Sequence, residues 1–289
     1  MSSKPYFADA PKVGKAIAAA LANQAADIDP AKLPDLTDKT GRTCTDLRQE
    51  FILLSDIFGL SALVDAMNHP VPVDSTATES TVLGPFFVED SKDIPAGDSI
   101  ASEGKGEYMY VSGRVLDLDG NPIPNCTIET WETDDEGLYD TQYDDRVEAD
   151  CRGRLLTDKD GKYSFRGVRP VGYPIPNDGP VGKLLKTLNR HVFRPSHLHM
   201  MLLADGFESL ITALYPKGDV YIKSDAVFGV KTSLMVELVP VHNDEEAKAL
   251  GFPKGGPFWR LDWDFVLQTK AQAEVEKRKS LAVAYKFEN

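Results

Sequence analysis

Hydrophobic positions follow two different spacings along the chain. Between about residues 12 and 69 they recur at helical intervals, so that Leu47, Phe51 and Leu54 fall on one face. From residue 108 onward, short runs of alternating apolar and polar residues are separated by Gly, Pro, Asn and Asp, which is typical of strands and turns. The pattern therefore predicts an α-helical part followed by a β part.

Six alternating segments are predicted to be strands, and the last shows the alternation most clearly. There Trp259, Leu261 and Trp263 alternate with charged residues, which indicates one buried face and places the tryptophans in the core. Short strands at this spacing favour an antiparallel sandwich. The predicted strands are residues 108–116, 126–133, 162–168, 197–203, 233–239 and 258–267.

The predicted fold class is α+β. A helical N-terminal region, residues 1–75, precedes a connecting segment, residues 76–107, and a mostly antiparallel β-sandwich domain, residues 108–289. The domain ends in a helical tail, where basic residues from Lys270 onward alternate with Glu274 at helical spacing. Such alternation is typical of a solvated helix rather than of a basic binding arm.

The charge balance argues against nucleic acid as a partner. The 289 residues include 32 basic and 45 acidic ones, which gives a net charge of −13 and repels phosphate backbones and anionic membranes. The three cysteines lack CxxC spacing, so a reducing compartment fits. With no signal peptide and no apolar run of about 20 residues, we expect a cytoplasmic protein without membrane insertion.

Histidine is scarce, yet it clusters. Of five histidines, His191, His197 and His199 fall within nine residues. Side chains two apart on a strand point to the same face, so His197 and His199 can present two imidazoles to one metal ion. A zinc hydrolase, a hydrogen-bonded pair and two core histidines are the alternatives at this point.

Two tyrosines are candidates for further metal ligands. Tyr139 and Tyr173 each follow a glycine at a predicted strand end. A phenolate is a hard anionic donor that a bound cation can deprotonate, so tyrosinate favours iron(III) over zinc. Judged by composition alone, both residues are more typical of ordinary turn tyrosines that pack against a sheet.

Four separated motifs together resemble the intradiol ring-cleavage dioxygenases. They are WETDDEGLYD, RPVGYPIP, HVFRPSHLHM and GDVYIKSDAVFGV, in the family's order, and the resemblance covers residues 80–267 closely. It implies Fe(III) as cofactor, O2 as co-substrate and a small aromatic diol or triol as substrate. It further implies that Tyr173 accepts a substrate proton and that Arg194 stabilises developing negative charge. The implied iron ligands are Tyr139, Tyr173, His197 and His199.

Residues 50–60, 78–87 and 172–185 look most like the hydroxyquinol 1,2-dioxygenases within that family. The implied reaction cleaves benzene-1,2,4-triol to 3-hydroxy-cis,cis-muconate, which tautomerises to maleylacetate. A catechol or chlorocatechol 1,2-dioxygenase with the same iron site is the alternative. By the same resemblance, the substrate walls are Leu53, Asp56, Val82, Leu83, Gly84, Pro85, Phe86, Ile175, Pro176 and Val227.

Two positions affect the choice of substrate. Asp56 lies in an apolar helical stretch, so it either faces solvent or accepts a hydrogen bond, and we hypothesise that it binds the third hydroxyl of the substrate. Ala213 stands where catechol dioxygenases commonly carry a glutamine near the iron, and its methyl group cannot hydrogen-bond.

The resemblance also implies a homodimer formed through the N-terminal helices, with a phospholipid bound at the interface. The helical pattern shows an apolar face, which burial against the β domain would also satisfy. One reading from another class is open as well: residues 111–131 fit a non-catalytic β-sandwich binding module. Such a module has no reason to carry the Tyr, Tyr, His, His set.

Overall fold

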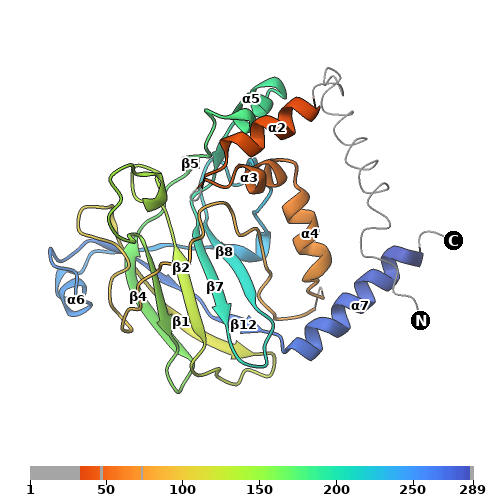
Figure 1. Ribbon diagram of the computed structural model, residues 1–289. Helices are drawn as coiled ribbons and strands as arrows, with labels where there is room; N and C mark the ends of the chain where they lie inside the picture. Colours follow the sequence, from red (N-terminus) through yellow and green to blue (C-terminus); the bar gives the residue numbers. More distant parts are fainter. Residues whose placement is uncertain (1–32, 46–47, 73, 287–289) are drawn as a thin grey trace.

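The computed structural model describes residues 33–45, 48–72 and 74–286, and it places a group of helices at one end of two packed β-sheets (Figure 1). The helical segment predicted before residue 33, and Leu47 within the next one, lie outside the described residues. The predicted α+β class is confirmed. The division into three parts at residues 75 and 107 stays a prediction.

The N-terminal helical prediction is confirmed for the described residues. The helices are α2 (Leu33–Thr43), α3 (Glu50–Ile57) and α4 (Leu60–Asn68). Gly59 separates the last two with a left-handed φ of 69°, which a glycine adopts without strain. Helix α3 buries Leu53 and Asp56, among others, towards the sheets, whereas α4 stays half-buried or exposed along its length.

The first sheet is built around the long strand β1 (Tyr108–Asp117). Its neighbours are β4 (Lys162–Val168), β10 (Val239–Val241), β11 (Phe258–Asp262) and β12 (Phe265–Leu267). Strands β11 and β12 both pair with β1 in parallel, so the sheet is mixed rather than purely antiparallel. The prediction of one continuous strand over residues 258–267 is wrong, because the segment is interrupted at Trp263 and forms two strands. The Trp263 carbonyl lies so close to Gly113 that a side chain at residue 113 would collide with it.

The second sheet has the order β3-β2-β7-β8-β9. These strands are β3 (Arg152–Leu156), β2 (Thr127–Trp131), β7 (Leu198–Leu203), β8 (Leu210–Pro216) and β9 (Met235–Val236). Pairing is antiparallel except between β8 and β9. The predicted strand 233–239 is wrong, because this segment forms the 3-10 helix η3 (Thr232–Leu234), then β9, and then enters the other sheet through β10.

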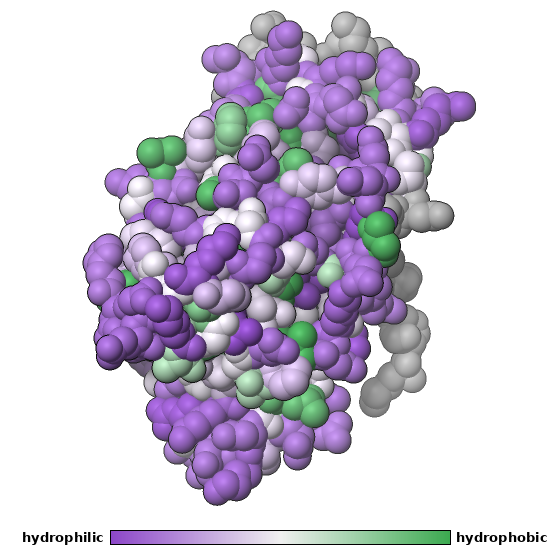
Figure 2. All heavy atoms as spheres, turned by 90° about the vertical axis from the view of Figure 1, so that its left-hand side faces the viewer, coloured by the Kyte–Doolittle hydropathy of each residue, from purple (hydrophilic) through white to green (hydrophobic). Residues whose placement is uncertain are grey.

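The remaining elements connect and flank the sheets. They are η2 (Asp140–Gln142), β5 (Tyr173–Pro174), α5 (Pro180–Thr187), β6 (Phe193–Arg194), α6 (Asp244–Ala249) and α7 (Lys270–Lys286). Helix α7 confirms the predicted tail and carries i,i+3 and i,i+4 ion pairs such as Arg278–Glu274. The face with α6 and β4 is mostly hydrophilic, with apolar residues scattered among polar ones (Figure 2). Among the described helices, none has the length and apolar character needed to cross a bilayer.

Strand β7 separates two buried regions. Leu198, Met200 and Leu202 point into the apolar core between the sheets, where side chains of both sheets meet. His199 points to the opposite face, towards the helices, because neighbouring side chains of a strand alternate. The tryptophans of the last predicted strand, Trp259 and Trp263, are half-buried and pack against the core between the sheets. The region around His199, where the candidate site residues are predicted, therefore lies between the second sheet and the N-terminal helices.

Candidate active site

Four predicted ligand residues come together at this end of the second sheet. Tyr139 caps η2, Tyr173 lies in β5, His197 directly precedes β7, and His199 lies within it. Each of the four side chains is at most 1% exposed. Segments far apart in the chain thus place two phenols and two imidazoles in one buried space.

The polar atoms of these residues converge. Tyr139 Oη lies 3.3 Å from Tyr173 Oη and 3.3 Å from His197 Nε2. His197 Nε2 lies 3.1 Å from His199 Nε2. Ligand atoms at roughly 2.0–2.2 Å from a common metal ion stand about 3 Å apart. The donor atoms therefore have the spacing of a first coordination shell.

The turn before Tyr139 is organised by a buried carboxylate. Asp134 accepts hydrogen bonds from the backbone N–H groups of Glu136 and Leu138. Gly137 has a φ of 76°, and a Cβ there would lie 3.0 Å from the Cβ of Tyr173. Because only glycine leaves this space free, the two tyrosine-bearing turns can approach each other.

The two histidines are neutral and present lone pairs to the centre. Burial lowers the pKa of His197 and of His199 well below the ordinary value. His197 Nδ1 lies 2.8 Å from the Pro195 carbonyl, which can only accept, so the proton resides on Nδ1 and Nε2 is free to bind a metal. Trp131 stacks on His199 with ring centres 4.7 Å apart and fixes the plane of that imidazole.

The two phenols stay protonated unless a strong positive charge is present. Burial raises the pKa of Tyr139 well above its ordinary value, and burial also raises the pKa of Tyr173. A bound cation would reverse this by stabilising both phenolates. Two neutral imidazoles and two such phenols suit a hard trivalent ion. A zinc site needs another ligand, and the described residues hold no group of three or more His, Cys, Asp or Glu that could bind a metal.

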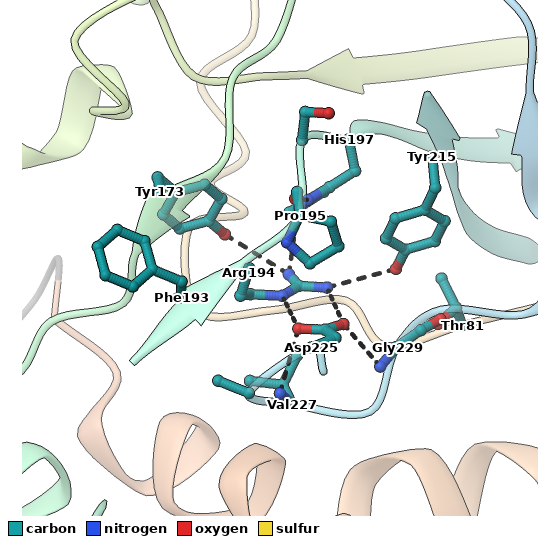
Figure 3. A network of polar contacts seen from close by, with 12 residues as sticks. Thr81, Tyr173, Phe193, Arg194, Pro195, His197, Tyr215, Asp225, Val227 and Gly229 are labelled. Carbon is teal, nitrogen blue, oxygen red and sulfur yellow. Dashed lines mark hydrogen bonds and ion pairs between the residues drawn. The ribbon is translucent and has the colours of Figure 1, made fainter. Parts of the chain in front are cut away.

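Arg194 is the charged residue closest to the donor atoms. Its Nη1 lies 3.1 Å from His197 Nε2 and 3.5 Å from Tyr173 Oη (Figure 3). Burial is the largest single influence and lowers its pKa, but the Asp225 carboxylate together with Tyr173 and Tyr215 outweighs burial, so that the pKa of Arg194 lies well above the ordinary value. The guanidinium is therefore a permanent positive charge inside the site.

The predicted wall residues surround the donor cluster but divide between two cavities. One of about 530 Å³ is lined partly by Leu53, Pro85, Phe86 and Pro176. The other, of about 450 Å³, is lined partly by Asp56, Val82, Leu83 and Gly84. Ile175 and Val227 are buried in the apolar cluster that contains Tyr139 and Tyr173.

Two wall residues directly contact the ligand set. A Cβ at Gly84 would lie 3.6 Å from His199 Nε2, and the φ of 74° disfavours any side chain there. Phe86 stacks on Tyr139 with ring centres 4.4 Å apart. Because Gly84 has no side chain, the backbone of this wall segment can approach the His199 imidazole closely.

Asp56 is buried, and neither of its carboxylate oxygens has a hydrogen-bond partner among the described residues. Burial raises its pKa to about 6, and the interaction of its carboxylate with the Ser61 side chain opposes that rise in part; the Ser61 hydroxyl also lies 2.9 Å from that of Ser55. Of the two alternatives from the sequence, solvent exposure is therefore wrong, and Ser61 is the neighbour in the chain that can hydrogen-bond the carboxylate. A buried acceptor without a partner is suited to a ligand hydroxyl.

Several residues of the site were not identified from the sequence. Asp225 and Tyr215 bind Arg194, and Trp131 stacks on His199. Trp131 and Asp225 both lie within motifs that carry the family resemblance. For Asp225, the available signal was an acidic residue within the otherwise apolar run SDAVFGV. Tyr215 is one of several large residues in an apolar strand, so no local signal marked it.

Known protein families account for most of the chain. Residues 82–269 match the family model described as "Dioxygenase", and residues 35–76 match the one described as "Catechol dioxygenase N terminus". The chain belongs to the intradiol ring-cleavage dioxygenases. Members of this family are oxidoreductases that cleave aromatic rings, so family membership favours an enzyme over a non-catalytic binding module.

Relatives within the family include curated proteins and solved structures. Hydroxyquinol 1,2-dioxygenase from Rhizobium sp. is 49% identical over 230 residues, which cover 79% of this chain and 77% of the relative. An intradiol ring-cleavage dioxygenase from Aspergillus niger is 47% identical over 243 residues, covering 84% and 72%. The structure of hydroxyquinol 1,2-dioxygenase from Pseudomonas putida DLL-E4 matches with a TM-score of 0.78 and 37% identity, covering 93% of this chain and 94% of the other.

Proposed function

We propose that this protein is an iron(III)-dependent hydroxyquinol 1,2-dioxygenase, which opens benzene-1,2,4-triol between its adjacent hydroxyls with both atoms of O2. The observation that carries the proposal is the convergence of Tyr139, Tyr173, His197 and His199, together with a buried Asp56 carboxylate that makes no close hydrogen bond among the described residues. Relatives of that name at up to 49% identity support it. The product is 3-hydroxy-cis,cis-muconate, the tautomer of maleylacetate.

The iron ligands in this proposal are the four residues of the cluster. Bound there, a ferric ion supplies Lewis acidity that ionises the phenols and activates the substrate diol towards O2. Tyr173 Oη accepts a proton from a substrate hydroxyl. It can hold that proton because burial raises the pKa of Tyr173 and so favours the neutral phenol when no metal is bound to it. Arg194 Nη1, 3.5 Å from that oxygen, stabilises negative charge that develops on the substrate.

The surrounding residues bind the ring and exclude water. Leu53, Phe86 and Ile175 are among the apolar groups that pack around the tyrosines. Asp56 accepts a hydrogen bond from the third hydroxyl of the triol, which catechol lacks. A site that binds a substrate hydroxyl through an otherwise unpartnered buried group discriminates strongly against the analogue without it.

The test compares substrates and one matched pair of variants. The iron-loaded protein is expected to show a higher kcat/KM for hydroxyquinol than for catechol, measured by O2 uptake. Asp56→Ala, which removes both acceptor oxygens, should lower kcat/KM for hydroxyquinol at least about tenfold more than for catechol. Asp65→Ala is the control, because Asp65 lines the same cavity but already binds His69 and Ser80. A parent enzyme that prefers catechol would establish the catechol or chlorocatechol dioxygenase instead.

We also propose a cytoplasmic homodimer formed through the N-terminal helices, with a phospholipid at the interface. Large apolar side chains exposed on α3 and α4 support it: Phe51, Ile52, Leu63, Val64 and Met67. Light scattering should give twice the monomer mass, and organic extraction followed by mass spectrometry should release a phospholipid. A monomeric mass would refute the dimer.

A further inference from the structure

Two nitrogens of the Arg194 guanidinium bind neighbouring side chains, and the third faces the donor atoms of His197 and Tyr173 (Figure 3). Its Nε lies 3.1 Å from Asp225 Oδ1, and its Nη2 lies 3.3 Å from Asp225 Oδ2. Nη2 also donates to Tyr215 Oη at 3.3 Å. Nη1 is therefore the nitrogen that faces His197 and Tyr173. Two nitrogens anchor the group, and the third points into the site.

Asp225 is itself fixed by its own loop. Its Oδ1 accepts a hydrogen bond from the N–H of Val227 at 3.2 Å, and its Oδ2 accepts one from the N–H of Gly229 at 2.9 Å. These bonds orient both oxygens towards Arg194. Because Val227 is also a predicted wall residue, the carboxylate, the wall and the guanidinium are positioned together.

Tyr215 provides the second anchor and connects it to the other wall segment. Its side chain is fully buried in β8. The Thr81 side chain interacts with the Tyr215 hydroxyl, and the Thr81 hydroxyl donates to the Gly229 carbonyl at 2.5 Å. Thr81 directly precedes Val82, the first predicted wall residue of its segment. The bond between Thr81 and Gly229 thus joins the two wall segments directly, next to the groups that hold Arg194.

Gly229 leaves the space that this network occupies. A Cβ at this position would lie 2.8 Å from Tyr215 Oη, 2.9 Å from Arg194 Nη2 and 3.2 Å from Asp225 Oδ2. The glycine does not have a left-handed φ, so an alanine there would introduce a steric conflict without backbone strain. The conflict would fall on the guanidinium itself and on the two groups that hold it.

We propose that Asp225, Tyr215 and Gly229 form a clamp whose role is to position Arg194 and aim its Nη1 at the reacting atoms. An unrestrained arginine side chain samples many rotamers, and a charge stabilises a transition state best when it is already in place. The catalytic meaning of the clamp rests on the proposed function. The position of the guanidinium does not.

The first test is a double-mutant cycle on the iron-loaded enzyme. Tyr215→Phe is expected to lower kcat about tenfold, and Asp225→Asn about a hundredfold, with smaller changes in KM. In an Arg194→Ala background, Tyr215→Phe should change kcat less than about twofold, because the group that it positions is gone. Tyr163→Phe is the matched control: it removes a buried hydroxyl that donates to the Trp263 carbonyl at 2.8 Å, and kcat should not change.

The second test observes the guanidinium directly. Crystal structures of the Tyr215→Phe and Gly229→Ala holoenzymes should show Arg194 displaced from its position in the parent, most of all in Gly229→Ala. Equal effects of Tyr215→Phe with and without Arg194, or an unmoved guanidinium in both variants, would overturn the clamp. If the parent enzyme cleaves no ring at all, the proposed function fails, while displacement in these structures still supports the clamp. These two variants suffice if Asp225→Asn does not fold.

Discussion

The two buried regions on either side of β7 are built differently. Between the sheets, side chains such as Met109, Phe165 and Leu202 form an apolar core, and the hydroxyl of Tyr163 in that core is satisfied by a backbone carbonyl. On the other side, Arg194 and Asp225 are buried among apolar groups as an ion pair. The first region stabilises the fold in proportion to its apolar area, at about 25 cal/mol per Å².

The second region contains polar groups that destabilise the fold. In the described structure, His199 Nδ1 and both oxygens of Asp56 are buried without close hydrogen-bond partners. Each such group costs about 1–3 kcal/mol. The proposed function gives these polar groups a role, and the apolar core between the sheets supplies stability that offsets their cost. The comparison predicts that substitutions in the two regions affect different quantities.

The largest expected effect is on activity, from His199→Ala. Loss of this proposed ligand should lower kcat by about three orders of magnitude or more, and the iron content should fall in parallel. Stability of the metal-free protein should change little, because the deleted imidazole has an unpartnered buried nitrogen. Iron content by elemental analysis and thermal unfolding measure the two effects. Full iron occupancy with unchanged kcat would remove His199 from the ligand set.

The opposite outcome is expected from Phe165→Ala in the sandwich core. Deleting this fully buried ring should lower the free energy of unfolding by about 3–5 kcal/mol. Denaturant unfolding measures the loss, and kcat per folded, iron-loaded molecule should stay within about twofold of the parent. A large fall in kcat with normal iron content would show that the two regions are not separable.

Glu132, whose Oε1 accepts from the N–H of Val168 in β4 and whose Oε2 is buried without a partner among the described residues, offers a pH-dependent test of what a buried carboxylate costs on the other side of the second sheet. Burial raises its pKa well above the ordinary value, so the stability that it contributes is complete below about pH 4.3, the unfolded value, and is lost as the pH rises towards the folded value. Glu132→Gln lacks this loss. The free energy of unfolding of the variant should match that of the parent near pH 4 and should exceed it by up to about 1.4 kcal/mol for each pH unit above that value. A constant difference across pH would contradict the assignment.

The smallest effects are expected from one conservative change made in both regions. Leu202→Met and Leu53→Met alter side chains that are both at most 1% exposed. Each should lower the free energy of unfolding by less than about 1.5 kcal/mol. Only Leu53→Met should change the ratio of kcat/KM for hydroxyquinol and catechol, by a few-fold, because only Leu53 is a predicted wall residue. Equal ratios in both variants would place Leu53 outside the substrate pocket.

Sequence by itself was sufficient for features encoded in local spacing. The alternation through His197 and His199 predicted two imidazoles on one face, and the helical and strand periods separated the α and β parts. The break of the last predicted strand at Trp263 could not be seen, since it depends on the close approach of Gly113, 150 residues away.

Contacts between distant segments were decided only in the tertiary structure. The pairing of Arg194 with Asp225 and Tyr215, and the unpartnered state of Asp56, depend on how loops and strands pack against one another. Period and motif record which side chains share an element, because backbone geometry repeats along it. They carry no record of which atoms meet across elements, because that is determined by the packing of the whole chain.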